Sequence, residues 1–243
     1  MILSRILFRY WDHWRGNLLK LPGGTIQARR NTMRGMDSGH IGVDESGKGD
    51  FFGPLVVAAC FVGPEHLAEL EGVMDSKKLT DAKALQLAAQ IQKYCPHTVL
   101  VIMPTRYNEL YAEIKNLNRL LEWGHAKVIE EVLKQRPCDL AISDQFANPA
   151  GLIRKLKLKG VNVELKSMVR AESDIAVAAA SILARAGFLK KLKQLGEEYK
   201  MDLPKGATNV INPGKRFVQT HGADKLANVA KMHFKTAGQV LAQ

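Results

Sequence analysis

The chain has 243 residues, enough for one substantial core and a small appendage. Its composition, 46% hydrophobic and 24% charged, is that of an ordinary globular protein. No run of the sequence approaches about 18 uninterrupted apolar residues, so we expect no membrane-spanning helix. The charge is the unusual quantity, because 35 Lys and Arg against 24 Asp and Glu give a net charge of +11.

A surplus of that size predicts a polyanionic partner, and nucleic acid is the commonest one. A basic surface that binds nothing is the alternative. The three cysteines, Cys60, Cys95 and Cys138, are widely spaced and form no CxxC pair and no cluster with histidine. They therefore predict neither a zinc site nor a disulfide framework, and they favour a reducing, cytoplasmic compartment.

Residues 1–40 differ from the rest and are interpreted as a basic N-terminal extension. Arg5 and Arg9 interrupt their apolar opening, which argues against a secretory signal. A basic arm and an amphipathic helix both fit this segment. The regular part of the chain, residues 41–243, is predicted to be one domain.

Strands over 41–45 and 55–62 with a glycine-rich turn between them predict a hairpin. A helix over 81–94 follows, with Thr80 as its N-cap. Helical spacing and apolar runs then predict, in order, a strand over 98–103, helices over 105–115 and 117–135, a strand over 139–144, a helix over 149–157, a strand over 161–165, and helices over 173–195 and around 223–235. This alternation indicates an α/β fold with a mixed sheet and a helical C-terminal region.

Four acids stand at strand ends or helix starts in apolar surroundings: Asp44, Glu45, Asp144 and Glu172. Clustered carboxylates repel one another and are costly to bury, so they need a proton, a basic partner or a metal ion. Oxygen ligands without nearby His or Cys favour Mg²⁺ or Mn²⁺, and two such ions can cleave a phosphodiester. Helix N-caps or surface charges are the alternative interpretation of each acid.

Asp44 and Glu45 present a geometric difficulty. Adjacent residues in a strand point to opposite faces, so a flat strand cannot aim both at one site. We expect Glu45 to lie where the strand ends or bends, which the following Gly47 and Gly49 permit. From these residues alone, a metal-dependent enzyme that acts on nucleic acid is indicated.

Several blocks of the sequence resemble one family. GVDESGKGDFFGPLVVAA at 42–59 closely resembles the opening of type 2 ribonucleases H, and DSKKLT at 75–80, SDQFAN at 143–148 and AESDIAVAAASILAR at 171–185 resemble later blocks of that family. Three features resemble the bacterial ribonuclease HIII branch: ESGKG where ribonuclease HII typically has EAGRG, a glutamate at 172 where HII has an aspartate, and the stretches NLNRLLEWGHA at 116–126 and VAKMHFK at 229–235.

The resemblance implies an RNase H-like fold, a central mixed sheet flanked by helices, and cleavage of the RNA strand of RNA–DNA hybrids. It implies a site with four carboxylates, which falls on Asp44, Glu45, Asp144 and Glu172, with Asp174 as the alternative for the fourth. Hydrolysis with two Mg²⁺ or Mn²⁺ ions would leave 5′-phosphate and 3′-hydroxyl ends. As an N-cap, Asp174 would instead have a structural role.

The turn of Ser46, Gly47, Lys48 and Gly49 is expected to bind substrate. Glycines let the backbone approach a sugar closely, so main-chain groups can bind the 2′-hydroxyl that distinguishes RNA from DNA. Lys48 would meet a phosphate. A plain hairpin turn is the alternative. Five further candidates for contacts to the nucleic-acid backbone are Lys77, Lys78, Lys231, His233 and Lys235.

One departure from the family stands in residues 1–40. Ribonucleases HIII usually carry a small N-terminal domain that resembles the TATA-binding protein, and forty residues are too few for it. We expect that the chain lacks the full domain, retains a remnant of it, or uses a basic arm in its place, and that the protein is a monomer. Two other functions stay open: incision at single embedded ribonucleotides as in ribonuclease HII, and hybrid binding without catalysis.

Overall fold

The computed structural model describes residues 39–73, 79–144, 149–158, 163–168 and 171–242. Five strands form one mixed sheet in the order β3-β2-β1-β4-β5. The strands are β1 (His40–Ser46), β2 (Leu55–Val62), β3 (His97–Ile102), β4 (Leu140–Asp144) and β5 (Glu164–Met168). β1, β2 and β3 pair antiparallel, whereas β4 runs parallel to β1 and β5 runs parallel to β4.

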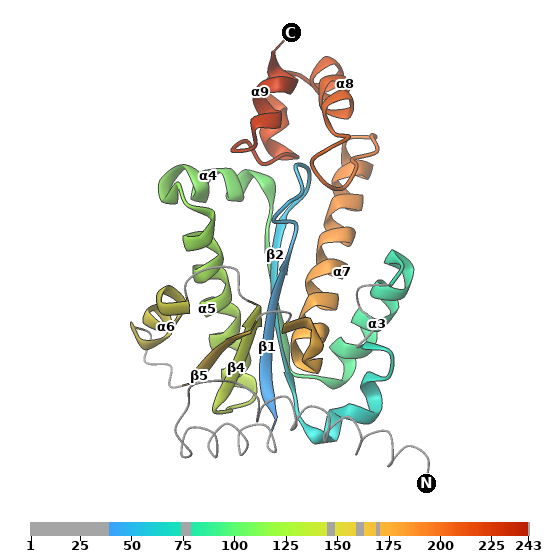
Figure 1. Ribbon diagram of the computed structural model, residues 1–243. Helices are drawn as coiled ribbons and strands as arrows, with labels where there is room; N and C mark the ends of the chain where they lie inside the picture. The colour runs from blue at the N-terminus through green and yellow to red at the C-terminus, as the bar shows by residue number, and fades with distance from the viewer. Residues whose placement is uncertain (1–38, 74–78, 145–148, 159–162, 169–170, 243) are drawn as a thin grey trace.

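Helices cover both faces of this sheet (Figure 1). On one face lie α7 (Ile175–Glu198) and α3 (Asp81–Tyr94), preceded by the short 3-10 helix η1 (Pro64–Leu70). On the other lie α4 (Pro104–Ile114), α5 (Leu117–Gln135) and α6 (Pro149–Leu158). β2 is buried along its whole length because alternate side chains enter the two helical layers. The fold is therefore α/β with an RNase H-like mixed sheet, as predicted.

Most predicted elements are confirmed. The helices over 81–94 and 117–135 have the predicted bounds, and the Thr80 hydroxyl accepts from the Lys83 N–H as an N-cap does. The strand expected at 161–165 is found at Glu164–Met168, and residues 161–162 lie outside the described part of the chain. Cys60 is fully buried, as expected of a small apolar side chain, and all three cysteines are free thiols.

The C-terminal region differs from its prediction. Instead of one helix around 223–235 there is a short 3-10 helix, η4 (Ala223–Asn228), then irregular chain, then α9 (Lys235–Leu241). A helix that sequence reasoning missed, α8 (Ile211–His221), precedes them. Pro213 and Gly214 obscured it. Pro213 lies in the first turn, where its missing N–H costs nothing, and Gly214 lets Val240 of α9 pack closely.

Helix α7 begins in unusually close contact with β1. A Cβ on Gly42 would stand only 2.0 Å from the Ala176 carbonyl carbon and 2.1 Å from the Val177 nitrogen. The start of α7 thus lies directly against the middle of β1 because residue 42 has no side chain. Of the helices in the described part of the chain, none combines the length and apolar character needed to cross a membrane.

We predict that Gly42→Ala destabilises the protein by about 3 kcal/mol or more, because the added methyl meets backbone that cannot move aside without shifting α7. Urea unfolding measures the change. Gly238→Ala is the matched control, since nothing lies within 4 Å of a Cβ there. Equal stability of the two variants would contradict this account of the contact.

Candidate active site

Asp44 and Glu45 lie side by side on β1 and point to opposite faces of the sheet. Asp44 pairs with Ala58, whose side chain packs in the layer of α7, and Glu45 pairs with Val57, whose side chain packs against α5. We expected Glu45 where the strand ends or bends, and β1 ends one residue after it, at Ser46. The alternation of the strand is kept, and one acid faces each helical layer.

Asp44 is partly buried against α7. Its carboxylate is hydrogen-bonded to the Ser181 hydroxyl of that helix, and its Oδ1 accepts from the Glu45 N–H at 2.8 Å. Burial, and then the charge of Glu45, raise the pKa of Asp44 to about 6. This carboxylate is therefore harder to ionise than that of an ordinary aspartate.

Glu45 lies between two basic side chains. Its Oε2 accepts from Nε2 of His125 at 3.0 Å, and its Oε1 lies 3.4 Å from Nζ of Lys48. His125 is fully buried on α5. Burial alone would raise the pKa of Glu45, but the hydrogen bond and charge of His125, together with Lys48, hold it below its usual value. Glu45 is consequently the ionised member of the pair.

The third predicted acid, Asp144, lies on β4, and the pairing of β4 with β1 places the backbone of Asp144 near that of Asp44. The parallel pairing of β1 with β4 runs from Ile41 with Ala141 to Val43 with Ser143. Asp44 and Asp144 are the next residues on the two strands, and the described pairing ends before them. The backbones of Asp44 and Asp144 thus stand one residue beyond the last described pair of the two strands. The side chain of Asp144 lies outside those described.

The fourth predicted acid, Glu172, belongs to the short 3-10 helix η3 (Ala171–Ser173), which packs against β4 and leads into α7. Its side chain also lies outside those described. Its competitor, Asp174, is the N-cap of α7: Oδ1 accepts from the Ala176 and Val177 N–H groups, and Oδ2 lies 2.8 Å from Nε2 of His40. With 2% exposure, this carboxylate is committed to the helix start.

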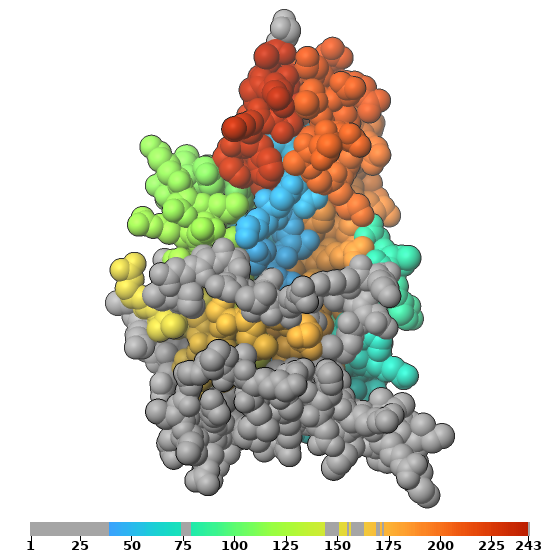
Figure 2. All heavy atoms as spheres, in the orientation of Figure 1, coloured from blue at the N-terminus to red at the C-terminus, as the bar shows by residue number. Residues whose placement is uncertain are grey.

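The predicted substrate turn, residues 46–49, joins β1 to the chain that returns as β2; we call it the glycine turn. Gly47 has φ of +87°, and a Cβ there would stand 2.2 Å from the Pro54 carbonyl oxygen, so glycine is required. Gly49 is exposed with open space around it, and Lys48 leans back toward Glu45. Figure 2 shows this blue segment at the surface, framed by the green chain of α4 and α5 and the red chain of α9.

Of the five further basic candidates, Lys235 alone among those described is fully at the surface. His233 is partly buried against Tyr111, with ring centroids 4.4 Å apart, and burial together with the charge of Lys231 lowers the pKa of His233. Lys77 and Lys78 lie outside the described residues.

Lys231 is a correction. Its side chain has 0% exposure, so it is not placed to meet a phosphate. Its Nζ instead donates to the carbonyl oxygens of Asp50 and Gly53, each at 2.8 Å. Burial lowers the pKa of Lys231 to about 7, and the negative charge of Asp50 opposes that shift.

The donors around Asp44 suit a hard divalent cation. Asp44 and Glu45 supply carboxylate oxygens, the ligands that such ions prefer, and burial together with the charge of Glu45 raises the pKa of Asp44. Among the side chains that the structure describes, no three His, Cys, Asp or Glu groups are clustered for a metal. A complete site needs ligands beyond these two, and β4 and η3 bring the backbones of Asp144 and Glu172 toward them.

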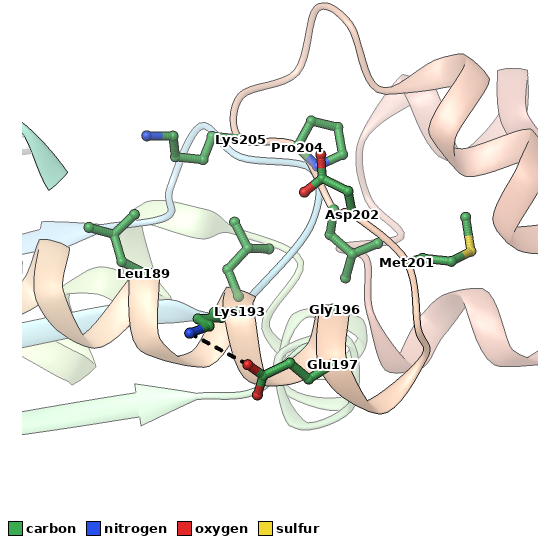
Figure 3. Close-up of a pocket in the computed structure, with 10 residues that line it drawn as sticks. Leu189, Lys193, Gly196, Glu197, Met201, Asp202, Pro204 and Lys205 are labelled. Atoms are coloured by element: carbon green, nitrogen blue, oxygen red, sulfur yellow. Dashed lines mark ion pairs between the residues drawn. The ribbon is translucent and has the colours of Figure 1, made fainter. Parts of the chain in front are cut away.

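A separate hollow of about 530 Å³ lies between the C-terminal half of α7 and the segment after it (Figure 3). Leu192, Met201 and Leu203 give it apolar walls, and Lys193 and Glu197 form an ion pair of 3.6 Å at its margin. No residue predicted to act on substrate lines it, so it is distinct from the acidic site.

Comparison with known proteins decides the family. The sequence profile of the ribonuclease HII family matches residues 41–237. Ribonuclease HIII of Protochlamydia amoebophila is 45% identical over 205 residues, which cover 83% of this chain and 68% of that protein. The chain belongs to this family of ribonucleases H, in the HIII branch.

Further HIII relatives agree. Ribonuclease HIII of Chlamydia pneumoniae is 45% identical over 206 residues, covering 82% of this chain and 69% of the relative. The crystal structure of Bst-RNase HIII in complex with Mn²⁺ superposes with a TM-score of 0.80 at 29% identity, over 92% of this chain and 75% of that one. The resemblance found in the sequence is confirmed, and that HIII relative holds a divalent metal.

Sequence reasoning missed two residues that contact the acids of this ribonuclease H. His125 and Ser181 were quoted only within family blocks. His125 lies on the core-facing stripe of α5 next to Gly124, where a buried histidine most often has only a packing role. The signal available in the sequence was one polar residue among the apolar residues of each helix, His125 in α5 and Ser181 in α7. Only the tertiary structure shows that each of them contacts an acid.

We predict that Asp44→Asn makes the metal-free protein relatively more stable as the pH rises. The pKa of Asp44 is raised in the folded state, so its stabilising contribution is complete below about pH 4 and is lost as the pH rises through about 6. Asparagine stays neutral. The unfolding free energy of the variant, minus that of the wild type, should grow by on the order of 1–3 kcal/mol between pH 4.5 and 7.5.

Urea unfolding in chelator at the two pH values measures this difference. Asp202→Asn, at an exposed carboxylate, makes the same change of charge and serves as the control. A difference between Asp44→Asn and wild type that does not change with pH would show that the environment of Asp44 was misjudged.

Proposed function

We propose that the chain hydrolyses the RNA strand of RNA–DNA hybrids with two Mg²⁺ or Mn²⁺ ions, leaving 5′-phosphate and 3′-hydroxyl ends. The carboxylates assigned to the metals are Asp44, Glu45, Asp144 and Glu172. The observation that carries the proposal is the pair Asp44 and Glu45 at the β1 edge beside the end of β4. Burial and mutual repulsion there raise the pKa of Asp44 in the absence of a cation.

Bound divalent ions would activate a water molecule and stabilise the leaving oxygen. The chain's own groups prepare the ligands. His125 and Lys48 keep Glu45 ionised, and Ser181 with the Glu45 N–H orients the Asp44 carboxylate. Asp174 is committed to capping α7, which supports Glu172 as the fourth acid.

The glycine turn supports the choice of substrate. It follows Glu45 directly, and it presents the exposed Gly49 and the Lys48 ammonium beside the acids. Main-chain groups of glycines can approach a ribose closely enough to bind its 2′-hydroxyl. The +11 charge supports attraction of the phosphate backbone, and Lys235 is an exposed candidate contact beyond the turn.

We predict that the wild type with Mg²⁺ cleaves a labelled duplex that contains four consecutive ribonucleotides, and that chelator abolishes the cleavage. Asp44→Asn should lose at least about a hundredfold in rate, because a metal ligand is removed. It should bind the hybrid as well as the wild type does, or better, because a negative charge is removed as well. Cleavage assays and fluorescence anisotropy measure the two effects.

A duplex with one embedded ribonucleotide is the matched substrate. Efficient cutting there would assign the chain the ribonuclease HII specificity. Binding of both duplexes without any cleavage would make it a hybrid-binding protein and overturn the proposal. An unfolded Asp44→Asn protein would show that Asp44 is a structural acid.

We further predict that His125→Phe weakens Mn²⁺ binding by about tenfold or more, because the phenyl ring keeps the volume but leaves Glu45 without its buried donor. Calorimetric titration with Mn²⁺ measures it. His221→Phe, at a ring packed between Tyr199 and Phe217, is the control and should bind Mn²⁺ as the wild type does. Wild-type affinity in a folded His125→Phe protein would remove His125 from the site.

A further inference from the structure

The C-terminal region of the chain holds the segment that follows the glycine turn. Between the end of β1 at Ser46 and the start of β2 at Leu55, the chain leaves the ladder and meets the C-terminal region (Figure 1). Phe52 forms an isolated antiparallel bridge with Ala230. The Gly53 N–H donates to the Val229 carbonyl at 2.8 Å. Residues far apart in the sequence thus set the path of the chain that follows the turn.

Lys231 stands at the centre of this junction. Its main-chain N–H donates to the Phe51 carbonyl at 2.9 Å. Its side chain passes inward, and Nζ donates at 2.8 Å to two carbonyls that bracket the same segment, those of Asp50 and Gly53. One residue therefore binds three carbonyls within residues 50–53, two of them through a side chain with no exposed surface. We call this arrangement the Lys231 clamp.

The groups facing the ammonium are few. The Tyr107 ring of α4 has its centroid 5.8 Å from Nζ, and Asp50 supplies the nearby negative charge. The Asp50 carboxylate is itself used, since its Oδ1 accepts from the Gly206 N–H at 2.6 Å. The clamp is therefore a buried amino group bound mainly by carbonyl oxygens, and an apolar side chain would leave those carbonyls without a donor.

The segment that carries Lys231 is itself held from α4. Asn108 donates through Nδ2 to the carbonyls of Ala227 and Ala230 at 3.0 and 2.9 Å, and its Oδ1 accepts from the Met232 N–H at 2.9 Å. The backbone around Lys231 is thus fixed by its hydrogen bonds to Asn108. Because Lys231 is held in this way, its side chain can fix the position of the glycine turn.

We propose that Lys231 is a positioning residue that, through the carbonyls of Asp50 and Gly53, holds the glycine turn in the conformation that distinguishes RNA from DNA. The inference deepens the proposed function and rests on it for the role of the turn. Lys231 touches neither the acids nor the surface, so its loss should affect the choice of nucleic acid while metal binding at Asp44 and Glu45 persists.

The test is Lys231→Met, which keeps a long unbranched side chain and removes the donor. Binding of an RNA–DNA hybrid and of a DNA duplex with the same base sequence is measured by anisotropy in Ca²⁺. We expect the preference for the hybrid to fall about tenfold, and KM for hybrid cleavage to rise by a similar factor while kcat changes less. The Mg²⁺ concentration that half-activates cleavage should stay unchanged.

Lys190→Met is the control, because it makes the same substitution at an exposed lysine on α7. Lys231→Ala adds a rescue arm, since ethylammonium can enter the vacated space and restore the hybrid preference, whereas ethanol cannot. If neither variant unfolds cooperatively, the preference is measured in Lys231→Arg, whose guanidinium keeps donors but displaces them, and we expect a reduced preference.

The outcomes separate the two proposals. Wild-type hybrid preference and wild-type KM in a folded Lys231 variant would overturn the clamp. Parallel weakening of hybrid and DNA-duplex binding would also overturn it, because it would show a general loss of charge. A wild type that binds both duplexes but cleaves neither would instead overturn the proposed function, and the preference measurement would still test the clamp.

Discussion

The alternation of side chains along β1 is the constraint on which the rest of this molecule depends. Two carboxylates adjacent on a strand must leave it on opposite faces, so the side chains of one helical layer cannot contact both. Ser181 of α7 hydrogen-bonds the Asp44 carboxylate, and His125 of α5 hydrogen-bonds the Glu45 carboxylate. The described pairing of β1 with β4 ends at Val43 and Ser143, immediately before Asp44. A sheet clad on both faces, with its short parallel strand ending beside the acids, satisfies this constraint.

Helix α7 sets the distances on one side of that arrangement. Because Gly42 lacks a side chain, the first turn of α7 rests on the β1 backbone, and about one turn further along Ser181 reaches Asp44. Asp174 ties the helix start to His40 at the beginning of the same strand. The residue that precedes the cap by two positions, Glu172, is carried to the sheet by these contacts. The N-terminus of α7 therefore determines both how the helix packs on β1 and where the backbone of Glu172 lies.

The two lysines next to the glycine turn show why charge alone is a poor guide to function. Lys48 and Lys231 are identical in sequence terms, and both lie in blocks typical of the family. One is 39% exposed beside Glu45, while the other has no exposed surface and binds carbonyl oxygens. The turn therefore has one lysine on its outer side beside Glu45 and another that is buried and bound to carbonyls of the chain that follows it. Opposite roles follow from burial, which a lysine's identity does not reveal.

From the sequence alone came the element order, the mixed α/β fold, the acids Asp44 and Glu45 and the family, because periodicity, caps and contiguous motifs are local properties of the chain. Helix α8 was missed, since a proline in a first turn looks locally like a helix breaker. Tertiary structure alone decided the pairing of His125 with Glu45, the pairing of Asp174 with His40, and the burial of Lys231. Each of these depends on a contact between residues 80 or more positions apart, and a side chain's charge or hydrogen-bond capacity acquires its role only when such a contact removes it from water.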